Sequence, residues 1–522
     1  MKARSTHDAD VAIAGAGPTG LLLAAELAMR GVRVVILERN AERPPFVRAF
    51  NLGPRSLELL DRRGIAERFI GEGRKVPFMS FAALEEPLDL SELDTDHPYV
   101  LGIAQTRTEA LLEAHALERG AELRWGHEVT SLVQDDDEVT IGVHDAIASR
   151  RYQFRARWMV GCDGGRSTVR KLAGIGFPGT AATRWSLLGD VELADPSSCG
   201  FGLHQTERGT VFVIPRPGYV RIIVGDPSPP TDRDQPVTLS ELAGAVRRVL
   251  ERDVGLENPR WLTRFGNAAR LAERYRAGRV LLAGDAAHVH PPAGAQGLNV
   301  GLQDAFNLGW KLAAVIQRWA PDALLDSYHA ERHRAGERVL MHTRAQAELG
   351  QTDERMAPVR ALLRSIARRP DVRRELAEMV TGLETRYEVA EPEVMSRQPW
   401  LGRLAPNTSV LAGDSVTSIA ACLSDGRALL VARAERAELA RLAAERAERV
   451  NLVYALPQTR VPAWLGDADA ACIRPDGHIE WIDDVTESRV APSALSCFSR
   501  RLTKAGPARS TRPKARRCGN GS

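Results

Sequence analysis

One segment, residues 278–299, constrains the fold of this chain more than any other. An apolar run leads into Gly284-Asp285, and a turn rich in glycine and proline then opens a helical stretch expected from Val300 to about Trp319. A strand, a turn and a helix in this order place the Asp285 carboxylate at the carboxyl end of a strand and free backbone N–H groups at a helix start. This combination suits a sugar hydroxyl beside an anionic ring or phosphate.

A second nucleotide signature stands near the other end of the chain. The apolar run 10–14 is followed by Gly15-Ala16-Gly17-Pro18-Thr19-Gly20 and an apolar stretch to Arg30, which predicts strand, turn and helix. Gly15 permits a tight turn, Gly17 lets the backbone approach a pyrophosphate, and Gly20 lets the helix pack closely on the strand. The next apolar strand ends in Glu38-Arg39. An acidic residue there can hydrogen-bond ribose hydroxyls and repels a 2′-phosphate, so the site is assigned to FAD and not to NADPH.

A third element, Asp163-Gly164, follows the apolar run 158–162 and precedes a Ser-Thr helix start. Taken alone, this pattern is equally typical of a turn with an N-cap. Its place between the other two signatures favours a cofactor role.

Length and composition exclude several classes of protein. At 522 residues the chain should divide into about two to four domains. No apolar run reaches the roughly 18 residues of a membrane span, and no signal-peptide core precedes residue 11, so we expect a cytoplasmic protein. The six cysteines form no C-x-x-C pair, so neither a zinc site nor a dithiol centre is indicated.

The charge is unevenly distributed along the chain. Residues 488–522 carry nine Lys or Arg and no acidic residue, so the net charge of +3 becomes −6 without them. This segment is rich in Pro, Gly, Ser and Arg and has no interleaved aromatic pattern, so we interpret it as a disordered, solvated tail. No nucleic-acid partner is expected.

The signatures are spread along the chain, which predicts a discontinuous cofactor domain. Valine- and isoleucine-rich runs at 211–214 and 220–224 flank a Pro-Arg-Pro-Gly turn and predict a hairpin, in a sheet that we expect the segment 79–90 to join. After residue 400 strands alternate with a helix. The predicted division is a cofactor domain (1–75, 100–180 and 270–350), a β-sheet substrate domain (76–99 and 181–269), a helical connection (351–399), a C-terminal αβ domain (400–484) and the basic tail (485–522).

The three signatures together resemble the class A flavoprotein monooxygenases, the p-hydroxybenzoate hydroxylase family. The likeness covers about residues 8–484 and is most specific in the cofactor domain. It implies an α/β multi-domain fold with a Rossmann-like FAD domain, a β-sheet substrate domain and a thioredoxin-like C-terminal domain without a C-x-x-C. It also implies reduction of FAD by NADPH or NADH and oxygen transfer from a flavin C(4a)-hydroperoxide, so the fold need not supply a catalytic residue.

The resemblance also implies roles for individual residues. Arg48 would lie near the pyrophosphate and influence flavin reduction, Gln105 would bond the ribityl chain, and the Val129 backbone would contact the adenine. Asp285 would hold ribityl hydroxyls, and the N–H groups of Leu298 and Asn299 would face the isoalloxazine. The full set of predicted cofactor residues is Gly15, Gly17, Pro18, Thr19, Gly20, Glu38, Arg39, Arg48, Gln105, Val129, Asp163, Gly164, Asp285, Gly297, Leu298 and Asn299. Position in the predicted domains suggests Met79, Phe81, Leu187, Phe212 and Pro292 for the substrate pocket.

Two positions need separate comment. His288 and His290 are two residues apart, but no third ligand lies nearby in the sequence, and we expect no metal site. Ala295 stands where the commonest motif has glycine. If that position requires a positive φ, the Cβ costs about 1 kcal/mol or more; we expect it to be tolerated.

The substrate is the least determined part of this interpretation. Sequence around 328–332 and 342–346 is similar to aromatic polyketide hydroxylases and rifampicin monooxygenases, which favours a polycyclic phenol or quinone. Inactivation of a rifamycin antibiotic and simple phenol hydroxylation are the alternatives. A flavin-dependent halogenase shares the cofactor domain, but the sequence lacks a Trp-x-Trp-x-Ile-Pro segment. A flavin-binding protein without turnover is another class, and we expect a monomer or homodimer.

Overall fold

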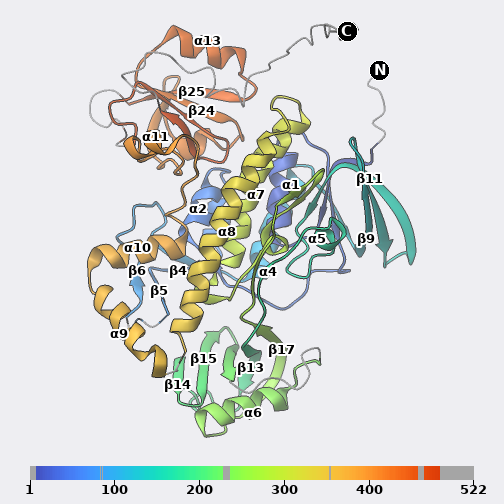
Figure 1. Ribbon diagram of the computed structural model, residues 1–522, viewed down its shortest axis with the longest axis vertical. Coiled ribbons are helices and arrows are strands. Elements are labelled where there is room, and N and C mark those ends of the chain that lie inside the picture. The colour runs from blue at the N-terminus through green and yellow to red at the C-terminus, as the bar shows by residue number, and fades with distance from the viewer. Residues whose placement is uncertain are drawn as a thin grey trace, which may run out of the picture.

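The computed structural model describes residues 7–82, 84, 86–226, 235–351, 354–456, 462 and 464–482. Its centre is an eight-stranded sheet assembled from distant parts of the chain (Figure 1). The main path runs in the order β19 (Arg276–Ala277), β20 (Val280–Leu282), β11 (Arg150–Gly161), β1 (Ala9–Ala14), β2 (Val34–Glu38) and β8 (Glu122–Trp125), and β10 (Val139–Asp145) and β9 (His127–Gln134) continue from β11. The middle strands β20, β11, β1, β2 and β8 are parallel, so their carboxyl ends share one edge.

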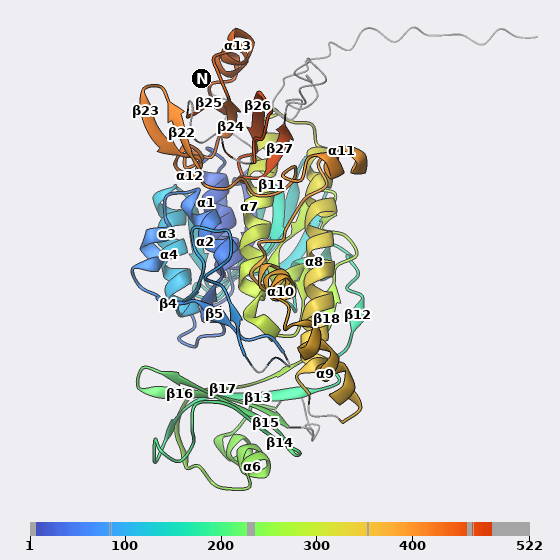
Figure 2. The same ribbon diagram turned by 90° about the vertical axis from the view of Figure 1, so that its left-hand side faces the viewer.

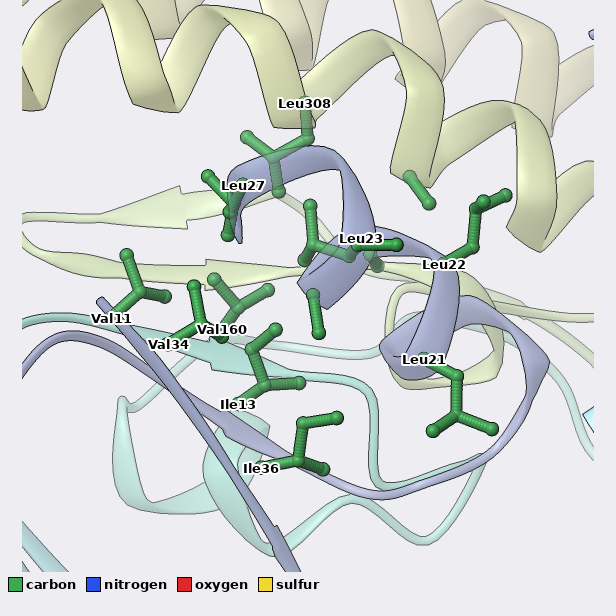
Figure 3. Packing of buried hydrophobic residues seen from close by; sticks show 14 of the residues in the cluster. Val11, Ile13, Leu21, Leu22, Leu23, Leu27, Val34, Ile36, Val160 and Leu308 are labelled. Carbon is green, nitrogen blue, oxygen red and sulfur yellow. The ribbon is translucent and has the colours of Figure 1, made fainter. Parts of the chain in front are cut away.

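Two helices cover one face of this sheet and bring the two nucleotide signatures together. The helix α1 (Pro18–Ala28) continues the glycine turn 15–20, and α7 (Gly297–Ile316) begins near the end of the segment 278–299. Figure 3 shows the α1 leucines between the strands and α7, where Leu23 and Leu27 meet Leu308. The predicted long helix is present, but it starts at Gly297, three residues before the expected Val300.

A five-stranded antiparallel sheet forms a separate layer. Its order is β14 (Gly202–Thr206), β15 (Gly209–Arg216), β16 (Tyr219–Asp226), β13 (Trp185–Leu193) and β17 (Leu256–Gly266), with α6 (Leu239–Leu250) packed on one face. Figure 2 shows α6 on the outer side and the opposite face toward the remainder of the molecule. The predicted hairpin is confirmed as β15 and β16, which turn at Gly218 with φ +75°.

The expectation that residues 79–90 join this sheet is wrong. The strands β5 (Phe78–Met79) and β6 (Leu88–Asp89) pair only with each other among the described strands. Phe81 and Leu88 are buried against Val380 of α10 (Pro370–Thr381), and this apolar contact decides where the segment lies.

A C-terminal unit lies over one end of α7 and α8 (Leu324–Leu349), as Figure 1 shows. Its six-stranded sheet has the order β23 (Ser415–Ser418), β22 (Ser409–Ala412), β25 (Val450–Ala455), β24 (Ala428–Ala432), β26 (Ala470–Ile473) and β27 (Ile479–Ile482). The helices α12 (Ile419–Cys422) and α13 (Ala437–Glu445) belong to the same unit. The strands predicted after residue 400 are present, and the predicted helix is shorter than expected.

The remaining elements connect these parts. They are β3 (Asn51–Leu52), α2 (Pro54–Asp61), α3 (Ala66–Ile70), β4 (Arg74–Val76), β7 (Val100–Gly102), α4 (Gln105–Glu118), α5 (Thr168–Leu172), β12 (Gly179–Thr180), β18 (Ala269–Leu271), β21 (His288–Val289), α9 (Ala357–Ile366) and α11 (Pro392–Arg397). The mixed α/β class is confirmed, while the domain boundaries stay a prediction. The predicted tail, 485–522, lies outside the described residues. Within the described part of the chain, no helix is both long and apolar enough to cross a membrane.

Candidate functional site

The turn between β1 and α1 is shaped by its glycines. Gly15 has φ +102°, and a Cβ on Gly20 would lie 2.1 Å from the Gly15 carbonyl oxygen, so the turn tolerates no side chain at either position. A Cβ on Gly17 would meet nothing within 4 Å. Gly17 is also the N-cap of α1 and brings no side-chain cap, so no side chain at the cap takes up the first N–H groups of the helix. This cradle fits a pyrophosphate.

The carboxylate of Glu38 is fixed at the carboxyl end of β2, beside this turn. Its oxygens accept hydrogen bonds from Ala16 N at 2.8 Å, Asn40 N at 2.9 Å and Asn40 Nδ2 at 2.7 Å. The neighbouring Arg39 is exposed. Arg39 and Arg48 line a surface groove of about 440 Å³.

Close contacts between the Thr19 side chain and two glycines hold the two signatures together. The Thr19 hydroxyl oxygen lies 2.7 Å from where a Gly284 Cβ would be and 2.2 Å from where a Gly301 Cβ would be. Glycine at both positions therefore lets α1 and α7 approach closely. The result is a shared edge at which the starts of both helices meet.

The turn before α7 contains two consecutive residues with positive φ. Gly294 has φ +72° and Ala295 has φ +50°, so the position with alanine in place of glycine does require the left-handed conformation. The first backbone hydrogen bond of α7 is donated by Val300 N to Gln296 O, so the N–H groups of residues 297–299 make no helical bond. These groups are available to an anionic ring.

Two side chains near this turn, Asp285 and Asn299, differ in their hydrogen bonds. Asp285 is exposed and has no hydrogen-bond partner among the described residues. The Asn299 amide oxygen accepts hydrogen bonds from Gly53 N at 2.8 Å and Ser56 Oγ at 2.6 Å, which ties the start of α2 to the start of α7. Asn299 therefore holds the turn with its side chain while its N–H stays available.

His288 belongs to a buried charge cluster. Its Nε2 lies 2.7 Å from Asp304 Oδ2, and Arg332 donates from Nε to Asp304 Oδ1 at 2.7 Å. Burial would raise the pKa of Asp304, but His288 and Arg332 outweigh it and hold that pKa below its ordinary value. No group of three or more ligand-type side chains suited to a metal ion occurs in the described part of the chain.

Two of the remaining predicted cofactor residues, Asp163 and Gln105, have side chains that already bond the backbone or a hydroxyl. Asp163 accepts from Ser167 Oγ at 2.5 Å and from Thr168 N at 2.7 Å, so it caps the start of α5. The oxygen of Gln105 accepts from Ala49 N at 3.0 Å. Val129 lies on β9, beside a register shift in its pairing with β10. Gly164 has φ +81° and open space around it.

A buried ion pair that the sequence analysis missed attaches the loop of Arg48 to the antiparallel sheet. Arg221 of β16 pairs with Asp190 of β13 at 2.7 Å and donates from Nη1 to the Arg48 carbonyl at 3.1 Å. Phe46 stacks on Trp261 with ring centroids 4.8 Å apart. A lone charge inside a strand gave no signal in the sequence, because its partner lies on another strand.

A cavity of about 530 Å³ borders the turn before α7. It extends between α7, α8 and the end of α10, and Met79 lines it, as predicted from domain position. Its arginines are engaged: Arg332 bonds Asp304, Arg338 bonds Glu384 at 2.9 Å, and Arg334 pairs with Glu388. Burial lowers the pKa of His342, which also lines the cavity, to about 4, so this histidine is neutral near pH 7.

The other predicted pocket residues lie elsewhere. Phe81 is buried against α10, and Leu187 is buried against α6, on the face of the sheet turned away from the cofactor signatures. Both predictions are corrected, because these two side chains pack in apolar clusters and do not line the cavity. Phe212 is on the opposite face from the α6 core and is 39% exposed, and Pro292 is exposed at the turn.

Comparison with known proteins now decides the family. The family described as "FAD binding domain" matches residues 8–343, and the one described as "Aromatic-ring hydroxylase, C-terminal" matches residues 398–503. The chain belongs to the FAD-dependent aromatic-ring hydroxylases. This hydroxylase is a flavin monooxygenase with FAD as its cofactor, and NAD(P)H and O₂ are the co-substrates typical of its class.

Relatives of the hydroxylase have defined activities. A rifampicin monooxygenase of Streptomyces venezuelae is 41% identical over 476 residues, which is 90% of this chain and 95% of the relative. The structure of an anhydrotetracycline hydroxylase of Streptomyces rimosus matches with a TM-score of 0.86 and 41% identity, over 94% of this chain and 99% of that one. An aklavinone-11 hydroxylase, solved with FAD and aklavinone, matches with a TM-score of 0.72 and 26% identity, over 95% and 99%.

Proposed function

We propose that this hydroxylase oxidises a polycyclic phenol or quinone of the aromatic polyketide type, with NADPH or NADH as the reductant. The observation that carries the proposal is the cavity of about 530 Å³ that opens at residues 294–299. A volume of this size accommodates a ligand of several fused rings. The named substrates of the relatives, anhydrotetracycline and aklavinone, support the same class.

The chemistry of the walls also favours an uncharged aromatic substrate. Three of the cavity arginines, Arg332, Arg334 and Arg338, have an acidic partner, and His342 is neutral. The fourth, Arg386, donates to the Leu401 carbonyl at 2.8 Å. A lining in which most cations are paired suits a phenol or quinone, which needs hydrogen-bond partners and apolar surface, better than a carboxylate.

One face of the five-stranded sheet supplies apolar surface toward the cofactor domain. Leu203, Phe212, Ile223 and Leu188 are cross-strand neighbours in one row. The side chains that alternate with them, such as Val211 and Ile222, are buried against α6. None of these four residues lines the cavity of about 530 Å³. We propose that the row faces the substrate from the side opposite the cavity, with Leu188 in the place first predicted for Leu187.

When bound and reduced, FAD activates O₂ so that one oxygen atom reaches an electron-rich ring. The chain's own residues bind, orient and exclude water. We propose that the α1 start holds the pyrophosphate, Glu38 and Asp285 hold sugar and ribityl hydroxyls, and the N–H groups of 297–299 stabilise the reduced ring. The same assignment extends to the other predicted residues: Arg39, Arg48, Gln105, Val129, Asp163 and Gly164.

Inactivation of a rifamycin is the second candidate. The rifampicin monooxygenase matches over 90% of this chain, as completely as the tetracycline relatives do. Rifamycins also present a fused phenolic ring system, so the same site chemistry serves both candidates.

Anaerobic stopped-flow reduction by NADPH tests the proposal and separates the candidates. We expect a polycyclic phenol to accelerate flavin reduction and to appear as a hydroxylated product when air is admitted. The variant Phe212→Ala should weaken this acceleration, while Val416→Ala, an exposed residue of the C-terminal unit, should leave it unchanged. Acceleration by rifamycins alone favours the second candidate, and acceleration by single-ring phenols alone contradicts both.

We also propose that the enzyme works in the cytoplasm, on small molecules and without a nucleic-acid partner, as a monomer or homodimer. The separation of its charge into an acidic body and a basic C-terminal segment is the feature to test, by sedimentation with and without residues 485–522.

A further inference from the structure

The C-terminal unit contributes a turn that contacts two of the helices bordering the cofactor site, α7 and α8. This turn, Arg474-Pro475-Asp476-Gly477-His478, joins β26 to β27. Arg474, Asp476 and His478 are 2%, 1% and 4% exposed. Charged side chains buried this deeply need partners, and they find them in the cofactor domain.

Three contacts tie the turn to α7, to α8 and to Arg63, and Arg63 in turn reaches α1. Trp310 of α7 donates from Nε1 to Asp476 Oδ2 at 3.0 Å, and Arg474 pairs with Glu331 of α8 at 2.8 Å. Arg63, which follows α2, donates from Nη2 to the Pro475 carbonyl at 2.8 Å and pairs with Glu26 of α1.

A fourth contact leads from the turn toward the Gly284-Asp285 signature. The His478 ring lies against Tyr387, with centroids 4.3 Å apart, and Arg332 Nη1 donates to the Tyr387 hydroxyl at 3.2 Å. Arg332 holds Asp304, whose Oδ2 accepts from Gly284 N at 2.9 Å. Gly284 has φ +61° and directly precedes Asp285. Four contacts therefore connect the C-terminal unit to Gly284, the residue before the one proposed to hold the ribityl chain.

We infer that the 474–478 turn and Tyr387 are positioning residues for FAD, acting through Arg332 and Asp304 on the turn at 284–288. This gives the C-terminal unit a role in the cofactor site although it has no C-x-x-C. The alternative is that the turn only attaches the C-terminal unit to the cofactor domain and has no effect on FAD. The inference rests on FAD binding and not on the proposed substrate, so a failed substrate assignment leaves it intact.

The decisive variant is Tyr387→Phe, assayed without substrate. It removes the hydroxyl that accepts from Arg332 but keeps the ring beside His478. Loss of one such hydrogen bond should raise the Kd for FAD about three- to tenfold and change the visible circular dichroism of the bound flavin. His478→Ala should act in the same direction, and His478→Phe, which keeps a ring against Tyr387, should recover part of the affinity.

The matched control is Val453→Ala, a buried core residue of the C-terminal sheet outside this connection. It should lower Tm without changing the Kd for FAD or the flavin spectrum. The inference is overturned if Tyr387→Phe binds FAD with wild-type affinity and spectrum. It is also overturned if Val453→Ala weakens FAD binding as much as Tyr387→Phe does, because a general loosening of the unit would then explain the effect.

Discussion

The start of α1 and the start of α7 face the same site, but their surroundings differ. At α1 the required shape comes from glycines within six residues, and Gly17 is surrounded by open space. At α7 the turn carries a left-handed alanine and is held by Asn299, which binds the start of α2, and by His342 of α8, which meets Gln296. One nucleotide turn is thus built locally, and the other is held by its neighbours.

The largest expected effect separates two glycines of the α1 turn. Gly20→Ala places a Cβ 2.1 Å from a backbone oxygen, which should cost about 3 kcal/mol or more and abolish FAD binding. Gly17→Ala meets no protein atom, so the apoprotein should keep its Tm while FAD binding weakens. Thermal unfolding and FAD titration of both variants test this. If Gly17→Ala lowered Tm as much as Gly20→Ala, the space around Gly17 would not be open in the apoprotein.

Removal of one carboxylate from each turn gives the next largest effect. Glu38→Ala and Asp285→Ala should both yield largely flavin-free protein, from lost hydrogen bonds to hydroxyls worth about 1–3 kcal/mol each. Only Glu38→Ala should also lower apoprotein stability, because Glu38 accepts from Ala16 N, whereas Asp285 has no partner within the described chain. Full flavin occupancy in both variants, read from the absorbance at purification, contradicts the site assignment.

The α7 turn is backed by a buried neutral histidine, which predicts an acid sensitivity. The ordinary pKa of 6.5 applies to the unfolded chain, and burial lowers the pKa of His342 to about 4. Between pH 6.5 and pH 4 the unfolded state binds a proton that the folded state does not. The free energy of unfolding therefore falls as pH falls, by up to about 1.4 kcal/mol per pH unit from this group.

The variant His342→Gln should lose this part of the slope while retaining an amide that can meet Gln296. Urea unfolding at a series of pH values between 7 and 4.5 provides the measurement. Curves for wild type and variant that run parallel over this range contradict the prediction.

The smallest effect belongs to Ala295. Glycine relieves the left-handed strain but adds chain entropy on unfolding, so Ala295→Gly should stabilise the protein by at most about 1 kcal/mol. We expect flavin occupancy to stay the same, because the alanine is tolerated. Much higher occupancy in the variant, measured from the flavin-to-protein absorbance ratio, contradicts this.

Local sequence predicted the shapes of the turns at the carboxyl edge of the central sheet because those shapes are local. Glycine spacing, a strand ending in Glu38 and a strand ending at Asp285 each encode a shape within a few residues, and the parallel sheet then brings these strand ends to one edge. The same reasoning failed for residues 79–90 and for Leu187. Alternation along a strand shows that two faces exist, but not which layer covers each one.

By itself, the sequence determined the family, the FAD cofactor and the α/β class, because those depend on short motifs whose residues lie next to one another. Only the tertiary structure decided that Phe81 packs on α10 and Leu187 on α6. It also decided that Arg221 binds the loop of Arg48, and that the 474–478 turn reaches Arg332 through Tyr387. The physical reason is that buried side chains and charges require partners, and these partners stand as many as 412 residues apart in the chain, as Arg63 and Pro475 do.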